Sequence, residues 1–128
     1  MVINKDLKLH NEWFILIARI SIVGIFAMSL FGKLTGFSGQ AAWIGKSFPI
    51  PEVLLIMAIL METIGIISLI SGYKMRYGCY TLILFTTLAS LMFHLGEGQA
   101  MDFFKNLAII GGLLALSELP AGKFSFKN

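Results

Sequence analysis

The sequence predicts an all-α integral membrane protein in which four helices form a bundle and both termini lie in the cytoplasm. The chain has 128 residues, of which 57% are hydrophobic and only 13% are charged, and its mean hydropathy is +0.84. A soluble domain of this size has too much surface for its volume to hide so much apolar area, so lipid is the remaining solvent. Several apolar runs also have the length of a helix that crosses a bilayer.

We treat residues 1–128 as a single membrane domain. Its four helices are predicted at about residues 11–33, 51–72, 77–95 and 102–119. Pro51 suits the first turn of the second helix, and Gly72 suits its C-terminal stop. In the connecting segment 34–52, residues Gln40 to Ile44 predict a short interfacial helix that places Trp43 at the lipid headgroups.

The basic residues between the helices predict the orientation in the membrane. Four spans put both termini on the same side as the turn between the second and third helices. On that side lie Lys5, Lys8, Lys74, Arg76, Lys123 and Lys127. Lys33, Lys46 and Lys105 belong to the opposite side. Because cytoplasmic segments carry the excess of lysine and arginine, the termini are predicted to be cytoplasmic.

The second predicted helix carries one carboxylate, Glu62, near its middle. A lone charge at that depth is unfavourable by at least about 3 kcal/mol unless it is paired or neutralised. At a rise of ~1.5 Å per residue, Glu62 lies roughly 16 Å and Arg19 roughly 21 Å from the outer ends of their helices. We therefore expect Arg19 and Glu62 to form a buried ion pair. This pair is either part of a functional site or a clamp that only fixes how the helices pack.

Four further polar side chains belong near the outer ends of three different helices. They are Lys33, His94, Lys105 and Asn106. We hypothesise that these residues surround a pocket open to the periplasm and bind a ligand there. Such a donor-rich, cationic site suits a ligand with carbonyl groups or negative charge, for example a quinone headgroup or a small oxyanion. In the alternative interpretation both lysines only extend to the headgroup region, as lysines near helix ends commonly do.

Several classes of function are disfavoured by the composition. The net charge is only +3 and the basic residues are scattered, whereas nucleic-acid binding needs a clustered basic face. The one cysteine, Cys79, excludes an internal disulfide and a cysteine-rich metal site. His10 and His94 belong to opposite membrane sides, which disfavours a haem. No metal site, intrinsic cofactor or catalytic residue is predicted, and we do not expect the chain to be an enzyme by itself.

Four short motifs together resemble the DoxX family of small bacterial membrane proteins. They are Phe31-Gly32-Lys33-Leu34, Phe48-Pro49-Ile50-Pro51, Glu62-Thr63-Ile64-Gly65 and Lys105-Asn106-Leu107-Ala108. Their order and spacing carry the resemblance, which extends over about residues 14–118. The sequence departs from the pattern at Leu30, where many relatives have a glycine.

The resemblance implies a four-helix protein of the bacterial inner membrane whose polar positions correspond to Arg19, Lys33, Glu62, His94, Lys105 and Asn106. It also implies an association with redox chemistry in some members of the family. A related protein, DoxD, is a subunit of an archaeal thiosulfate:quinone oxidoreductase, and a mycobacterial DoxX is linked to a membrane oxidoreductase complex. The expected partners are lipid, subunits of a redox complex, quinone and further copies of the chain. Two alternatives stay open, namely a non-catalytic binding or assembly module and a pathway for protons or small solutes.

Overall fold

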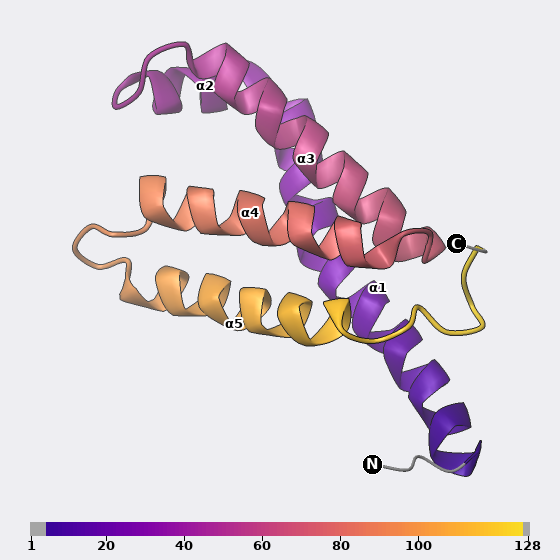
Figure 1. The fold of residues 1–128 in the computed structure, drawn as a ribbon. Coiled ribbons are helices and arrows are strands. Elements are labelled where there is room, and N and C mark those ends of the chain that lie inside the picture. The colour runs from indigo at the N-terminus through magenta and orange to yellow at the C-terminus, as the bar shows by residue number, and fades with distance from the viewer. Residues whose placement is uncertain (1–4, 127–128) are drawn as a thin grey trace.

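The computed structural model of this chain describes residues 5–126, and these contain helices and no strands (Figure 1). The helices are α1 (Lys5–Thr35), α2 (Phe37–Gly45), α3 (Pro51–Ser71), α4 (Met75–Phe93) and α5 (Ala100–Ser117). The predicted all-α class is therefore confirmed. The predicted bounds of the last three helices agree with the structure to within two residues at each end.

The first helix is longer than predicted. It begins at Lys5 instead of at about residue 11, because the polar residues ahead of the apolar run still form helical backbone. Polarity marks where the apolar run begins, and not where the helix begins. The short helix predicted at Gln40 to Ile44 is present as the longer α2, while its position at the membrane interface stays a prediction.

The ends of α3 follow from two backbone positions. Ile50 precedes the helix with a φ of 47° and Pro51 occupies its first turn. Gly72 ends the helix with a φ of 76°, and its N–H donates a hydrogen bond of 2.8 Å to the Ser68 carbonyl. A residue without Cβ adopts this left-handed conformation without strain, so Gly72 is the C-terminal stop that the sequence predicts.

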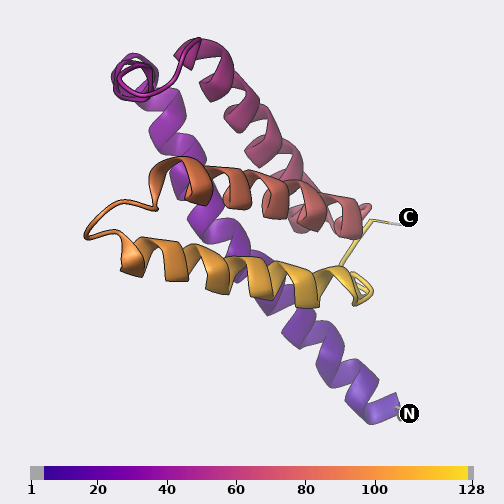
Figure 2. The same ribbon diagram turned by 60° about the vertical axis from the view of Figure 1, so that its left-hand side comes forward.

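The four long helices contact one another in a closed ring. α1 contacts α3 and α5, and α4 contacts α3 and α5, while α2 packs against α3 and α1. In Figures 1 and 2, α4 and α5 run side by side and α1 crosses this pair obliquely. α3 and α4 approach each other closely at Gly65, where an added Cβ would lie 2.3 Å from Leu82 Cγ, and at Gly78, where it would lie 2.3 Å from Ser68 Oγ.

Within the described residues, three helical stretches are long and apolar enough to cross a membrane. They are Glu12–Thr35 of α1, Pro51–Ser71 and Ala100–Ser117. Large apolar side chains such as Phe31, Ile67 and Leu114 are exposed on these helices, as lipid contact requires. α4 has 19 residues, but Arg76, Tyr77 and several threonines make it less apolar.

A fourth span and a cytoplasmic location of the termini remain predictions. Lys127, which enters the charge argument, lies outside the described residues, as do the side chains of Lys5, Lys8 and His10.

The segment after α5 folds back onto the end of α3. The Phe126 N–H donates a hydrogen bond of 2.7 Å to the carbonyl of Ser71. Figure 1 shows this segment returning to the corner where α3 ends and α4 begins. The return of the C-terminal segment, residues 118–126, places its backbone carbonyls close to α1.

Candidate functional site

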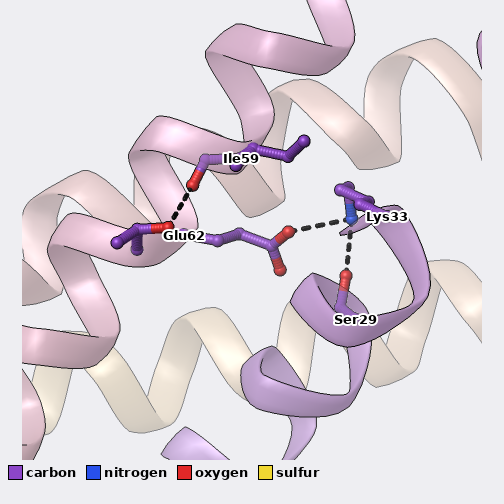
Figure 3. A network of polar contacts seen from close by, with 5 residues as sticks. Ser29, Lys33, Ile59 and Glu62 are labelled. Atoms are coloured by element: carbon purple, nitrogen blue, oxygen red, sulfur yellow. Dashed lines mark hydrogen bonds and ion pairs between the residues drawn. The ribbon is translucent and has the colours of Figure 1, made fainter. Parts of the chain in front are cut away.

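Glu62 forms its ion pair with Lys33. Glu62 Oε1 lies 2.9 Å from Lys33 Nζ, and the side chains of Lys33 and Glu62 are 13% and 0% exposed. Lys33 Nζ also donates a hydrogen bond of 2.6 Å to Ser29 Oγ, one turn earlier on α1 (Figure 3). The two opposite charges offset much of the unfavourable desolvation that either would suffer alone at this depth.

The direction of helical side chains explains why Lys33 points inward. Side chains on an α-helix lean toward its N-terminus. Lys33 lies in the last turn of α1, so its side chain leans back along the helix toward Ser29. Lys105 lies near the start of α5, so the same lean carries its side chain toward the N-terminal end of that helix. The Lys105 side chain is exposed. Lys33 therefore does not extend to the headgroup region. The exposed Lys105 fits the alternative interpretation, in which the lysine extends there.

The ion pair predicted between Arg19 and Glu62 does not form. The Arg19 side chain is fully buried and donates to four carbonyl oxygens instead. The acceptors are Leu69 at 2.7 Å, Ile70 at 2.8 Å, Ala121 at 3.0 Å and Phe124 at 2.9 Å. The last carbonyls of a helix lack intrahelical partners and carry partial negative charge. The end of α3 and the returning C-terminal segment therefore satisfy the guanidinium without a carboxylate.

A cavity of about 370 Å³ lies beside the Lys33–Glu62 pair, between α1, α3 and α4, and residues of α2 and α5 also line it. Most of its lining is apolar, and the aromatic residues include Trp43, Phe85 and Phe93. The polar residues that line it are Ser29, Lys33, Gln40, Glu62, Thr86, His94 and Asn106. Three of the four predicted ligand residues thus line one cavity. Lys105 does not.

Some polar residues of the cavity have hydrogen-bond partners within the protein, and others do not. His94 Nδ1 lies 2.8 Å from Gln99 Oε1, and Asn106 Nδ2 donates a hydrogen bond of 2.9 Å to Ser90 Oγ. Thr86 Oγ1 and both carboxylate oxygens of Glu62 are buried and make no hydrogen bond with any residue that the structure describes. Of the two carboxylate oxygens, Oε1 has the Lys33 ammonium beside it in the ion pair. Buried polar atoms are almost always hydrogen-bonded. Thr86 Oγ1 and Glu62 Oε2, which have neither a hydrogen bond nor an ion pair among the described residues, therefore mark the part of the cavity wall that is incomplete without a ligand or water.

Sequence reasoning missed four residues of this site. Ser29, Gln40, Trp43 and Thr86 line the cavity but were not predicted as ligand residues. One signal for Ser29 is its position four residues before Lys33 on the same helix, where side chains meet. Thr86 lies four residues before Ser90 and eight before His94, so the three side chains share one face of the helix. Ser90 accepts the hydrogen bond from Asn106. Gln40, on the short helix α2, has no comparable spacing to another polar residue of the cavity.

The cavity suits an uncharged ligand better than an ion. Lys33 and Glu62 cancel in charge, and the rest of the wall is largely apolar with a few convergent polar groups, which is the usual composition of a small-molecule site. Among the described residues, no three His, Cys, Asp or Glu side chains gather as metal ligands would.

Comparison with known proteins places the chain in a family. Residues 14–95 match the DoxX family. The chain belongs to the DoxX family. All cavity-lining residues except Asn106 and Ile109 fall within the matched region.

Two relatives give the cellular location. The inner membrane protein YqjF of Escherichia coli (strain K12) is 32% identical over 114 residues, which are 87% of each chain. The inner membrane protein YphA of the same organism is 29% identical over 120 residues, covering 87% of this chain and 86% of YphA. No solved structure matches the chain. Together with its apolar helices, this similarity identifies the chain as an inner-membrane protein of the DoxX family.

Proposed function

We propose that this DoxX protein is a membrane subunit of an oxidoreductase system and that its cavity binds the headgroup of a quinone or quinol. The observation that carries the proposal is a buried ion pair, Lys33–Glu62, in the wall of a largely apolar cavity. Neither carboxylate oxygen of Glu62 is hydrogen-bonded within the described residues, and Oε2 lies outside the ion pair as well. The redox context comes from the family resemblance, since the related DoxD is a subunit of a thiosulfate:quinone oxidoreductase and a mycobacterial DoxX is linked to a membrane oxidoreductase complex.

The apolar part of the cavity fits a substituted ring. Met57, Met61 and Met92 line it together with Phe85 and Phe93. Methionine side chains adapt to irregular shapes, and aromatic side chains pack against a flat ring by offset or edge contacts. A ligand that dissolves in the bilayer therefore gains apolar contacts on entering the cavity.

The polar part of the wall matches the oxygen atoms of such a ring. An ammonium group has three N–H donors, of which Lys33 gives one to Ser29 Oγ, while its charge pairs with Glu62 beside it and leaves at most one N–H directed at the carboxylate. The third is available for a ligand oxygen. Thr86 adds a hydroxyl that donates or accepts, and Glu62 Oε2 adds an acceptor. A small oxyanion, which we also considered from the sequence, finds no net positive charge here and too much apolar surface.

Tryptophan fluorescence tests the proposal directly. The sequence contains two tryptophans, and Trp13→Phe leaves Trp43, in the cavity wall, as the single reporter. Decyl-ubiquinone added to this protein in lipid nanodiscs is expected to quench Trp43 and to reach saturation. Lys33→Met/Glu62→Gln is expected to weaken saturable binding by about tenfold or more, the equivalent of one charge-assisted hydrogen bond.

The control variant is Lys105→Ala, which changes an exposed lysine outside the cavity and should leave the titration unchanged. Quenching that rises linearly without saturation, and equally in every variant, contradicts quinone binding. The chain would then be an assembly module whose buried polar residues are structural.

A further inference from the structure

We infer that the cavity selects the reduced, hydroxyl-bearing form of its ligand over the oxidised, carbonyl-bearing form, and that Glu62 Oε2 is the atom that makes the selection. This inference rests on the proposed function, because it concerns the same cavity. It adds which oxidation state of the ring the site holds.

The two oxygens of Glu62 have different surroundings. Oε1 forms the ion pair with Lys33, which donates its hydrogen bond to Ser29 (Figure 3), and Oε1 itself accepts no hydrogen bond from the described residues. Oε2 is fully buried and has no hydrogen-bond partner in residues 12–126. The neighbouring hydroxyl of Thr63 does not serve it, since that hydroxyl donates a hydrogen bond of 2.7 Å to the Ile59 carbonyl. One oxygen is therefore fixed in place while the other still needs a donor.

A carboxylate in an ion pair only accepts hydrogen bonds. A carbonyl oxygen of a quinone is also only an acceptor, so a quinone oxygen placed at Glu62 Oε2 would be repelled. A quinol hydroxyl at the same place donates its proton into a charge-assisted hydrogen bond, which is shorter and stronger than a neutral one. The reduced ring thus completes the wall, and the oxidised ring does not.

Thr86 and Lys33 contribute to binding of the ring, but they do not distinguish quinol from quinone. Thr86 Oγ1 lies on α4, is buried and has no hydrogen-bond partner in the described part of the chain. A hydroxyl and an ammonium both donate to a carbonyl oxygen and to a quinol oxygen alike. Both forms of the ring satisfy these two groups, so the difference between the forms is left to Glu62.

Calorimetric titration under anaerobic conditions tests the inference with three matched ligands on the wild-type protein in nanodiscs. The ligands are decyl-ubiquinol, decyl-ubiquinone and the dimethyl ether of decyl-ubiquinol, which keeps the reduced ring but lacks the hydroxyl hydrogens. One extra hydrogen bond to a charged group predicts that the quinol binds about tenfold or more tightly than either of the others.

The outcomes separate the two proposals. Equal affinities for quinol and quinone overturn the selection by Glu62 and leave quinone binding intact. Quinol and dimethyl ether of equal affinity also overturn it, because the hydroxyl hydrogens would then contribute nothing. If none of the three ligands gives saturable binding, the proposed function fails.

Two variants assign the selection to its residue. Lys33→Met/Glu62→Gln removes both charges together and leaves an amide that donates as well as accepts, so the preference for quinol should fall below about twofold. Thr86→Val should weaken both forms by similar factors and keep the preference. A preference that persists in the double variant contradicts the role of Glu62. Because the wild-type comparison alone decides the main question, the inference stays testable even if the double variant does not fold.

Discussion

Lys33 Nζ lies 2.9 Å from Glu62 Oε1 and joins the last turn of α1 to the middle of α3. Both groups belong to helices that are apolar enough to span the membrane. The pair holds the two helices together by charge at a depth where water does not screen it. It is also the most polar part of the cavity wall, so packing and ligand binding depend on the same two side chains.

Removing one member of this pair should destabilise the protein more than removing both. Lys33→Met leaves a buried carboxylate without its partner, and we expect a loss of about 3 kcal/mol or more. Lys33→Met/Glu62→Gln removes both charges and should recover most of that loss. Denaturant unfolding in detergent micelles measures each value, with the exposed Lys105→Ala as a control within about 0.5 kcal/mol of wild type. Equal losses in the single and double variants would show that the two charges do not interact.

The contacts of Arg19 predict a defined effect on the C-terminal segment. Arg19→Met removes the hydrogen bonds to the Ala121 and Phe124 carbonyls, so this segment should detach from the end of α3. Lys123 is exposed within it, and trypsin should then release the peptide that begins at Phe124 faster than from wild type. Arg19→Lys is expected to resemble Arg19→Met, because an ammonium does not reproduce the fork of a guanidinium. Unchanged release, followed by mass spectrometry, would mean that Arg19 does not hold the segment.

The close approach of α3 and α4 can be tested with two glycines. At Gly65 an added Cβ would lie 2.3 Å from Leu82 Cγ, whereas at Gly111 it would meet nothing within 4 Å. Gly65→Ala is therefore expected to destabilise the protein by about 1–3 kcal/mol. Gly111→Ala should be neutral or stabilising by up to about 1 kcal/mol, because alanine favours a helix. Thermal unfolding of both variants checks the contrast, and equal stability would exclude tight packing at Gly65.

The predicted fourth span and its orientation call for a labelling experiment. Cys79 is the single cysteine and is fully buried, so Cys79→Ser gives a cysteine-free background. Tyr73 and Glu97 lie beyond opposite ends of α4 and are both exposed. With a membrane-impermeant maleimide on intact spheroplasts, Glu97→Cys should react and Tyr73→Cys should react only after lysis. Labelling of both from the same side would mean that α4 does not cross.

Apolar length and helix-ending residues were enough to predict the helices. Pro51 and Gly72 bound α3 as expected, since their backbone preferences act locally. The small α2 was predicted from the segment Gln40 to Ile44, which contains Trp43 and lies between two glycines. The start of α1 was misplaced because residues 5–11 are polar but still helical.

The pairing of the buried charges was harder to predict. Counting residues along two straight helices gave similar depths to Arg19 and Glu62, and opposite charges suggested a pair. That count does not consider the carbonyl oxygens at the end of a helix as acceptors for an arginine. It also does not predict that residues 118–126 fold back and supply two further carbonyls to Arg19. It also ignores the lean of Lys33 toward the N-terminus of α1, which brings its ammonium to Glu62.

Photo-crosslinking with an azido-quinone tests most directly whether the cavity binds a quinone or quinol headgroup. The account predicts label on cavity-lining residues such as Trp43, Met61 and Phe93, suppressed by excess decyl-ubiquinol and lost in Lys33→Met/Glu62→Gln. Label spread over outward-facing residues such as Phe31 and Ile67, and unaffected by the competitor, would contradict it.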